Sequence, residues 1–439
     1  MANNYWISAT LGDLIDIKHG FAFKGDFFRD NPPGDLLLTP GNFIIGGGFK
    51  DDKFKYYVGP VPSDYILEEG DLIVTMTDLS KNADTLGYPA LVPKVKVYRY
   101  LHNQRLGKVI IRAGAPLRND YLYFLLCSRP YRNEVLASAT GTTVKHTSPE
   151  RIKAFKFLLP PLSEQEEIAK ILGTLNSKIE LNRQMNRTLE VITRALFKSW
   201  FVDFDPVRTK LGGRVPYGMD AEPASLFPNS FDVSPFGEVP KGWKIGTIGD
   251  VADNPRRGVA PNDVIQSTPY IGLEHMPRKS IALEEWGSAQ DVTSNKYRFY
   301  QGEILFGKLR PYFHKVGIAV QDGVCSTDIL VIVPKSPEWF GFVLSHVTSD
   351  EFVQYADGTS TGTKMPRTNW SDMKAYKIYF PPKNIAEHFN ERVQGMVELI
   401  MANILQSHTL ISVRDALLPK LLSGEIRVKD AEKYAEALL

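Results

Sequence analysis

A long helical pattern that occurs twice constrains this chain more than any other feature of its sequence. The first copy starts at Pro160 (PPLSEQEEIAKILGTLNSKIELNRQMNRTLEVITRALFKSW), and the second starts 221 residues later at Pro381 (PPKNIAEHFNERVQGMVELIMANILQSHTLISVRDALL). Both copies predict one long helix, because the proline pair prevents an earlier start and an S/N-x-x-E capping box follows it. The predicted capping boxes are Ser163 with Glu166 and Asn384 with Glu387.

Apolar side chains recur every 3.5 residues in both copies, which is the period of a coiled-coil seam. One asparagine interrupts each seam at the equivalent place, Asn182 and Asn403. A polar seam residue usually fixes register or partner at some cost in stability, so we predict that the two helices pair. The alternative is that each helix packs separately on its own domain. In the first copy the pattern also takes in Met185 and Ile192. The predicted seam is Ile168, Leu175, Asn182, Leu189, Leu196, Phe389, Met396, Asn403, Leu410 and Leu417.

The repeat extends beyond the helix to a whole module. ATGTTVKHTSPERIKAFKFLLPP from Ala139 aligns without a gap to STGTKMPRTNWSDMKAYKIYFPP from Ser360, and EGDLIVTM at Glu69 is echoed by QGEILFGK at Gln301. Short β-rich runs with Gly and Pro clusters precede each long helix, with one predicted helix at residues 119–137 that breaks near Pro130. We therefore predict an α+β chain with two similar strand-rich domains, each followed by a long helix, the two helices pairing as an antiparallel coiled coil.

The repeat boundaries give a division into segments. The segment 205–241 carries six prolines and four glycines without an apolar period, so we predict a linker that buries too little to order itself. The predicted segments are a strand-rich domain at 1–160, a long helix at 161–204, the linker at 205–241, a second strand-rich domain at 242–381, a second long helix at 382–423 and a tail at 424–439.

Sequence motifs for catalysis are weak. GTSTGTK at Gly358 lacks the spacing of a phosphate-binding loop. Asn31-Pro32-Pro33 is similar to the loop of adenine methyltransferases, yet Gly34 stands where an aromatic ring must stack on the base. The histidines include no H-E-x-x-H, and neither Cys127 nor Cys325 has metal-ligand spacing, so we predict no metal site. These observations favour a protein that binds rather than reacts.

No apolar run approaches the length of a membrane span in this reading, and the start lacks a signal-peptide profile, so we predict a cytoplasmic protein. The net charge is only +2, so a nucleic-acid partner would have to be attracted by local basic patches.

Basic, aromatic and amide-bearing loops are the candidate binding sites. The run from Gly307 to Lys315 is rich in cations and rings, whereas its counterpart from Thr77 to Asp84 is polar. Because Arg and Lys read guanine and phosphate while Asn reads adenine, unequal loops at equivalent places predict unequal recognition. The candidates are Lys81, Asn82, Lys145, His146, Lys308, Arg310, Tyr312, His314, Lys315, Lys364 and Arg367.

With these residues in view, the chain resembles the specificity subunit of type I restriction-modification enzymes. The resemblance rests on a Gly-Thr loop, a strand that ends in Pro-Pro, then L-x-E-Q-x-x-I and a long helix, twice in one chain. Here the first copy reads Gly141-Thr142, Pro160-Pro161 and Glu164-Gln165, followed by LFKSWFVDFDPVR. The second copy keeps Gly362-Thr363, Pro381-Pro382 and LLPKLLSGEIRV but replaces Glu-Gln by Ile385-Ala386.

The resemblance implies that each strand-rich domain is a target-recognition domain that reads one half of a bipartite, asymmetric site in double-stranded DNA. It implies that the paired helices act as spacer and dock two methyltransferase subunits, and through them the restriction subunits. About 38 helical residues span roughly 57 Å, more than the roughly 34–36 Å of one turn of B-DNA.

The chain itself is then non-catalytic and holds no cofactor. S-adenosylmethionine, ATP and Mg are expected in the partner subunits, where adenine N6 methylation and ATP-dependent cleavage occur. Two alternatives stay open at this point: a DNA adenine methyltransferase with a fused recognition domain, and a coiled-coil adaptor that binds no DNA.

Overall fold

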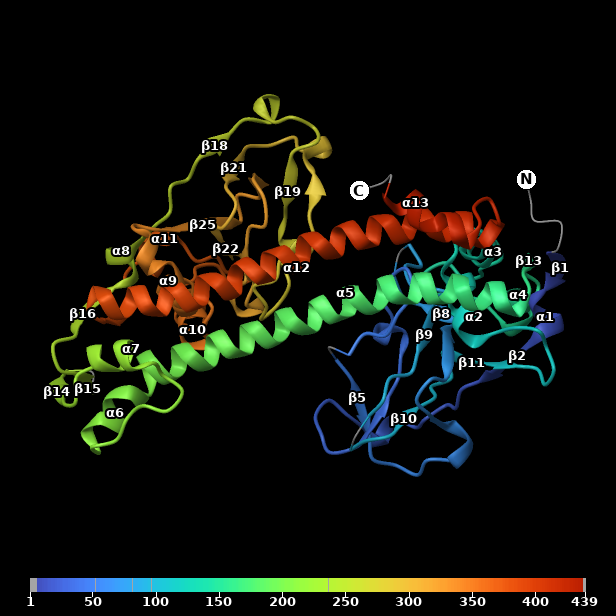
Figure 1. Ribbon diagram of the computed structural model, residues 1–439, viewed down its shortest axis with the longest axis horizontal. Helices are drawn as coiled ribbons and strands as arrows, with labels where there is room; N and C mark the ends of the chain where they lie inside the picture. Colours follow the sequence, from blue (N-terminus) through green and yellow to red (C-terminus); the bar gives the residue numbers. More distant parts are fainter. Residues whose placement is uncertain (1–5, 52, 81, 96, 236, 437–439) are drawn as a thin grey trace. The chain divides into compact units, whose positions relative to one another are not determined.

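The chain forms two compact units, each with its own strand-rich core. The structure is a computed structural model that describes residues 6–51, 53–80, 82–95, 97–235 and 237–436 (Figure 1). The first unit comprises Met1–Ser177 with Thr409–Leu439, and the second comprises Lys178–His408. The unit boundaries therefore fall inside the two long helices, whereas the sequence repeat divides the chain at the helix ends.

The first unit is built around two sheets and the start of a long helix. One sheet has the strand order β2-β11-β7-β9 and the other has the order β3-β5-β4-β10-β6, while β1 pairs with β13 and β12 pairs with β8. The strands are β1 (Ile7–Thr10), β2 (Ile15–His19), β3 (Phe28–Arg29), β4 (Asp35–Leu37), β5 (Lys55–Tyr57), β6 (Ile66–Leu67), β7 (Leu72–Thr75), β8 (Thr77–Asp78), β9 (Pro89–Leu91), β10 (Tyr100–Leu101), β11 (Leu106–Ile111), β12 (Lys145–His146) and β13 (Lys156–Leu159). The helices are α1 (Leu11–Leu14), α2 (Asn119–Cys127), α3 (Arg129–Ala137), α4 (Pro149–Lys153) and α13 (Ala431–Glu436).

The second unit repeats this plan. Strand order β17-β25-β22-β23 corresponds to the first sheet, strand order β18-β21-β24-β19-β20 makes the second, and β16 pairs with β26 as β1 does with β13. The strands are β16 (Lys244–Thr247), β17 (Ala252–Asp253), β18 (Gly258–Val259), β19 (Pro269–Ile271), β20 (Gly287–Ser288), β21 (Lys296–Phe299), β22 (Ile304–Gly307), β23 (Val316–Ile318), β24 (Gly323–Cys325), β25 (Ile329–Pro334) and β26 (Lys377–Phe380). The helices are α8 (Ile248–Val251), α9 (Phe340–Val347), α10 (Asp350–Gly358) and α11 (Trp370–Met373).

The predicted break in the helix at residues 119–137 occurs between α2 and α3. Ser128 is the N-cap of α3, its hydroxyl accepts a hydrogen bond from the Tyr131 amide, and Pro130 lies in the first turn, where its missing N–H costs nothing.

The two long helices are α5 (Leu162–Phe197), which continues into a π-helical turn at Lys198–Val202, and α12 (Lys383–Ser423). Both start one residue after their proline pair, because the amide of Gln165 donates to the Pro161 carbonyl and that of Ile385 to the Pro382 carbonyl. The predicted capping boxes are therefore wrong: Ser163 and Asn384 lie inside the first turn. Glu166 instead pairs with Arg118, and Glu387 with Lys383.

The prediction that the helices pair as an antiparallel coiled coil is confirmed. In the second unit the amide of Asn182 donates to the Ser407 hydroxyl at 3.2 Å, and the amide of Asn403 donates to the Asn186 side-chain carbonyl at 2.9 Å. The 221-residue offset of the repeat makes Asn182 equivalent to Asn403 and Asn186 equivalent to Ser407. The two contacts are therefore equivalent, and a local two-fold symmetry relates the two helices at this polar layer. In the first unit Arg414 donates to Asn176 at 3.0 Å, which continues the same antiparallel order.

On the C-terminal side of Asn182, the buried seam differs from the seam predicted from the apolar pattern. Ile192 is 45% exposed, while the polar Asn186 and Thr193 are buried in the positions that continue the heptad from Leu172. The apolar pattern predicted the wrong residues there, because Asn186 and Thr193 are polar but make hydrogen bonds where they are buried. Asn186 accepts from the Asn403 amide, and the Thr193 hydroxyl donates to the Leu189 carbonyl. The predicted seam residues Ile168, Asn182, Phe389, Asn403 and Leu417 are buried, and Leu175, Leu189, Leu196, Met396 and Leu410 are partly buried.

The segment 205–241 is ordered, unlike the linker expected from its prolines. It forms α6 (Asp205–Leu211), α7 (Ala221–Leu226) and a hairpin of β14 (Phe231–Ser234) with β15 (Gly237–Pro240). Val207, Phe227 and Val239 are buried in the core of the second unit with Trp200 and Phe204 at the end of the long helix. A few large apolar side chains without a period therefore anchor this segment, because the core they enter is made by other elements.

Helix α12 is long and apolar enough to cross a membrane by length and composition alone, with a mean hydropathy of 1.3 over its most apolar window. The prediction that no such run exists is therefore wrong. The criterion is weak evidence for a span, because the core helix of a soluble protein passes it too, and α12 pairs with α5 through the buried Asn403 and Ser407.

Candidate nucleic-acid interface

The candidate loops come together in pairs at one equivalent place in each unit. In the first unit His146 pairs with Thr77 where β12 meets β8. In the second unit Arg367 pairs with Leu309 in an isolated bridge. The register is the same in both units, because the Thr147 amide donates to the Met76 carbonyl and the Thr368 amide donates to the Lys308 carbonyl.

The glycine of each Gly-Thr loop makes this pairing possible. Gly141 has φ +93° and Gly362 has φ +100°, and a Cβ on Gly141 would lie 2.0 Å from the Val144 carbonyl oxygen. Because only glycine adopts this conformation without strain, the loop closes on itself. The hydrogen bonds from the Thr140 and His146 amides in one unit and from the Thr361 and Arg367 amides in the other close it.

A third segment joins each pair of loops. The Met76 amide donates to the Arg105 carbonyl and the Lys308 amide donates to the Asp328 carbonyl, both at 2.9 Å. Counting along these ladders makes three positions equivalent between the two units. They hold Asp78, Arg105 and His146 in the first unit and Arg310, Asp328 and Arg367 in the second.

The cluster of three positions in the first unit is organised by a buried carboxylate. Asp78 is 3% exposed, and its oxygens accept from the amides of Ser80 and Thr85 and from the Thr85 hydroxyl, each at 2.6 Å. Burial alone would raise the pKa of Asp78, but the hydrogen bonds from Thr85 and Ser80 outweigh it and lower the pKa. This carboxylate shapes the loop 78–85 and is not available to a ligand.

The predicted residues of the first unit surround this loop. Asn82 is exposed on it, His146 is exposed with Nδ1 3.2 Å from the Thr77 hydroxyl, and Lys145 is half-buried in β12. Lys81 lies outside the described residues.

The second-unit cluster carries the opposite charge at two of its three positions, because Arg310 stands at the place of Asp78 and Asp328 at the place of Arg105. Arg310 has φ +49°, its amide donates to the Pro366 carbonyl, and its guanidinium donates to the Lys364 carbonyl at 3.4 Å. Arg367 donates through Nε to Asp328 at 3.0 Å, and this hydrogen bond raises the pKa of Arg367. Lys364 and Tyr312 are exposed beside them.

Lys308 lies in the same cluster and is half-buried. Burial lowers the pKa of its ammonium group, as do the neighbouring charges of Arg256 and Arg367, while Asp328 opposes the shift. The cluster therefore concentrates several cations around one carboxylate, which suits a polyanion with acceptor groups.

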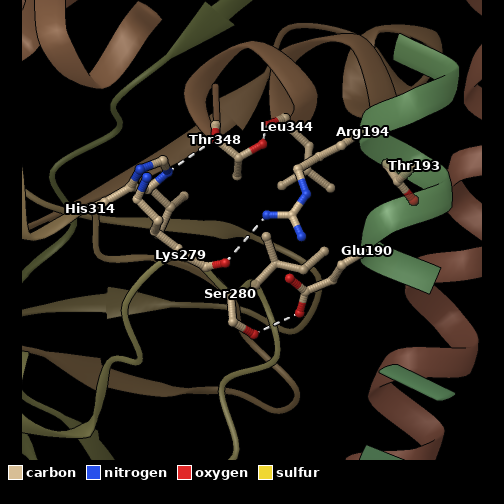
Figure 2. Close-up of a pocket in the computed structure, with 10 residues that line it drawn as sticks. Glu190, Thr193, Arg194, Lys279, Ser280, His314, Leu344 and Thr348 are labelled. Atoms are coloured by element: carbon tan, nitrogen blue, oxygen red, sulfur yellow. Dashed lines mark hydrogen bonds between the residues drawn. The ribbon is translucent and has the colours of Figure 1, made fainter. Parts of the chain in front are cut away.

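His314 does not belong to this surface, contrary to the sequence prediction. It is 8% exposed, and its Nε2 lies 3.0 Å from the Thr348 carbonyl oxygen (Figure 2). Its backbone carbonyl accepts from the Lys279 amide, and its Nδ1 lies 3.3 Å from Asp350. His314 itself has a left-handed backbone, φ +51°, and its contact with Asp350 joins the loop to α10.

Lys315 is also turned away from the surface that Arg310 and Lys364 share. Its ammonium group donates to the Leu273 carbonyl, and burial lowers its pKa. It therefore serves the packing of the loop.

Figure 2 also shows how α5 contacts this region. A cavity of about 20 Å³ is lined by Glu190, Arg194 and Ser280 among others, and Glu190 accepts from the Ser280 hydroxyl at 2.6 Å. The cavity holds about one water molecule, so it is a packing gap between α5 and the strand-rich part of its own unit.

The Asn31-Pro32-Pro33 run lies in an open surface hollow of about 520 Å³. The described residues that line it are Arg29, Asp30, Asn31, Pro32, Pro33 and Val58, and they include no aromatic ring that could stack on a base.

Comparisons with known proteins agree with this geometry. Residues 3–191 match the family model described as the type I restriction modification DNA specificity domain. The type I restriction enzyme MjaIX specificity subunit of Methanocaldococcus jannaschii is 25% identical over 344 residues, which cover 75% of this chain and 73% of the relative. The HindI specificity subunit of Haemophilus influenzae is 26% identical over 359 residues, which cover 70% and 77%.

Residues 3–191 therefore match this family, and the chain is similar to type I restriction enzyme specificity subunits over about three quarters of its length. The fold agrees with a solved S subunit from M. genitalium, which has a TM-score of 0.57 at 14% identity and covers 96% of this chain and 97% of that one.

Two positions of the candidate site were missed by the sequence reasoning. Arg105 and Asp328 occupy the third position of each cluster, but neither lies in a cation-rich run. The repeat offered the signal. Arg105 directly precedes β11 and Asp328 directly precedes the equivalent strand β25, so a search at the starts of equivalent strands would have found both residues.

The described residues contain no group of three His, Cys, Asp or Glu side chains that could hold a metal ion. Cys127 and Cys325 are both unpaired thiols, and burial raises the pKa of each to about 12.

Proposed function

We propose that this specificity subunit reads one half of a bipartite, asymmetric double-stranded DNA site with each strand-rich domain. One observation carries the proposal: the same backbone positions hold Asp78, Arg105 and His146 in one unit and Arg310, Asp328 and Arg367 in the other. A shared scaffold with different polar groups at the same place presents different donors and acceptors to base edges. A duplicated domain that reads no DNA has no reason to carry opposite charges at equivalent positions.

The base-reading residues we propose are the exposed ones, together with the half-buried Arg310. They are Asn82 and His146 with Arg105 in the first domain, and Arg310, Tyr312, Lys364 and Arg367 in the second. Lys81, Lys145 and Lys308 suit phosphate contacts, since a lysine binds phosphate as a point charge.

We propose that two methyltransferase subunits dock on the paired helices and that restriction subunits join through them. Exposed apolar side chains on α5 and α12, among them Leu181, Val191 and Leu399, support this, because exposed apolar surface suits contact with a protein partner. S-adenosylmethionine, ATP and Mg then bind the partner subunits, and the whole complex works in the cytoplasm.

Mapping methylated adenines tests the proposal. The chain is co-expressed with its methyltransferase subunit, and genomic DNA is sequenced for N6-methyladenine. We expect one split, asymmetric motif, and we expect no methylation when the chain is expressed alone. Methylation by the purified chain alone, or binding of S-adenosylmethionine to it, would instead support the fused methyltransferase. A complex that methylates without sequence preference would support the adaptor.

A further inference from the structure

In the second-unit cluster, two of the three equivalent positions, Asp328 and Arg367, are joined by a hydrogen bond between their side chains. Arg367 Nε donates to Asp328 Oδ1 at 3.0 Å, with 47% of the arginine side chain and 27% of the aspartate side chain exposed. Within the part of the chain that the structure describes, the two Nη groups of Arg367 make no hydrogen bond. The outer edge of the guanidinium is therefore open.

The backbone holds both residues before any ligand arrives. Arg367 exchanges two hydrogen bonds of 3.0 Å with Thr361. Asp328 accepts from the Lys308 amide at 2.9 Å and donates its own amide to the Ser326 hydroxyl at 3.2 Å. The backbone at both ends of the pair is held by hydrogen-bonded loops, and the hydrogen bond between the two side chains restricts their rotamers, so less conformational entropy is lost on binding.

We infer that Asp328 and Arg367 form a guanine-reading pair, in which Arg367 contacts the base and Asp328 is its positioning residue. The inference rests on the proposed function and names the base class that this domain reads. An arginine whose Nε edge is occupied presents its two Nη groups as a fork, and that fork matches the O6 and N7 acceptors of guanine in the major groove. The carboxylate fixes the plane of the fork.

The first domain lacks this pair, which makes the inference specific to the second half-site. Its equivalent positions hold Arg105 and His146, two groups that cannot form an ion pair with each other, and its carboxylate, Asp78, is occupied within its own loop. A guanine contact made by an arginine that a neighbouring carboxylate positions is therefore expected in the second half-site only.

An ordinary surface ion pair is the competing interpretation, and exposed pairs contribute little to stability. The two interpretations differ in what the aspartate does. A surface ion pair has no effect on base choice, whereas a positioning carboxylate changes the choice at one base pair without removing the cation that reads it.

The experiment uses the complex with its methyltransferase subunit and a DNA pool randomised at each base pair of the mapped site. Methylation is sequenced for wild type, Asp328→Asn, Arg367→Lys and Asp16→Asn. Asn keeps the shape of the aspartate, and Lys keeps the charge of Arg367 without its fork. Asp16→Asn is the matched control, because Asp16 accepts two hydrogen bonds of 3.0 Å from Arg112 in the first unit, outside either cluster.

We expect Arg367→Lys and Asp328→Asn to lower the preference for guanine at the same single base pair of the second half-site, by about tenfold. The first half-site and the control variant should keep the wild-type pattern. Unchanged preference in Asp328→Asn, or a change at a different base pair from that of Arg367→Lys, overturns the inference and leaves the proposed function intact. A wild-type complex without any preferred motif overturns the proposed function itself.

Discussion

At the residue scale, the same kind of side chain has different uses depending on what surrounds it. Arg310 is half-buried with its backbone in a left-handed conformation, while His314, four residues on, is buried against Thr348. The carboxylate of Asp78 accepts hydrogen bonds within its own loop, whereas that of Asp328 accepts a hydrogen bond from an arginine side chain. Residue type alone does not separate a reading group from a packing group.

Replacing Arg310 by Ala should lower discrimination at one or two base pairs of the second half-site by about 1–3 kcal/mol each, because a lost bidentate contact removes that much selectivity. Sequencing methylation in a randomised DNA pool measures it. The control is Lys308→Ala, which removes a proposed phosphate contact in the same cluster and should weaken binding to all sequences alike. Unchanged specificity in the Arg310 variant would mean that this side chain touches phosphate or nothing.

His102 predicts a pH dependence of stability. It is fully buried, and burial lowers its pKa from 6.5 to about 4, although the hydrogen bond to the Leu106 carbonyl at 3.0 Å opposes the shift. The unfolded chain then binds a proton more readily than the folded one, so stability is complete above pH 6.5 and is lost as the pH falls toward 4.

We expect the free energy of unfolding from this group to fall by about 2 kcal/mol between pH 7 and pH 5. Urea unfolding of the purified chain at both pH values, for wild type and His102→Gln, measures it. A variant with as large a fall as wild type would assign the pH dependence to other groups.

At the element scale, polar side chains tie the long helices to each other and to their domains. Gln165 is fully buried, accepts from the Arg118 amide at 2.9 Å, and donates to the carbonyls of Pro116 and Pro160. The Glu-Gln pair of the first copy is therefore a tie between helix and domain rather than a cap. In the second copy Asn390 does related work by accepting from the Gly341 amide at 2.8 Å.

Replacing Gln165 by Leu should destabilise the first unit by about 3 kcal/mol, because several buried polar groups lose their partners together. Thermal unfolding followed by circular dichroism measures the shift of the transition. Glu166→Gln, the matched neighbour, removes only an exposed ion pair with Arg118 and should cost less than about 1 kcal/mol. Equal effects of the two substitutions would contradict the role of Gln165.

The polar layer at Asn182 and Asn403 predicts a loss of register without a loss of folding. Replacing both by Leu removes the paired amide contacts to Ser407 and Asn186 and adds apolar seam area, so the helices should stay paired but lose one preferred alignment. Sequencing the spacing between methylated half-sites reports the alignment. Thr193→Val, elsewhere on the seam, is the control, and unchanged spacing and assembly in the double variant would show that the asparagines do not set register.

At the scale of the whole molecule, the compact units do not coincide with the sequence repeats. The end of α12 and the tail pack within the first unit, where Leu417, Leu421 and Ala431 join Trp6 and Leu11 in one core. A recognition domain is therefore completed by chain segments more than two hundred residues away.

Exchanging residues 1–160 for those of another family member should change one half of the methylated motif and leave the other half intact. A chimera in which residues 409–439 are also exchanged should be more stable than one in which only residues 1–160 are, because its C-terminal segment then comes from the same protein as the core that it packs against. Methylation sequencing and thermal unfolding of the two chimeras test both statements. A change in both half-sites would contradict independent reading.

The sequence by itself determined the duplicated module, the pairing of the helices and the loops that carry the candidate site. These features repeat locally, as a period of 3.5 residues or a shared glycine at Gly141 and Gly362, so they are visible without a fold. Only the tertiary structure decided that His314 is buried, that Thr193 replaces Ile192 in the seam, that residues 205–241 are anchored and that Asp328 meets Arg367. Those outcomes depend on contacts between distant segments, and burial and hydrogen bonding at such contacts are not encoded in any local pattern.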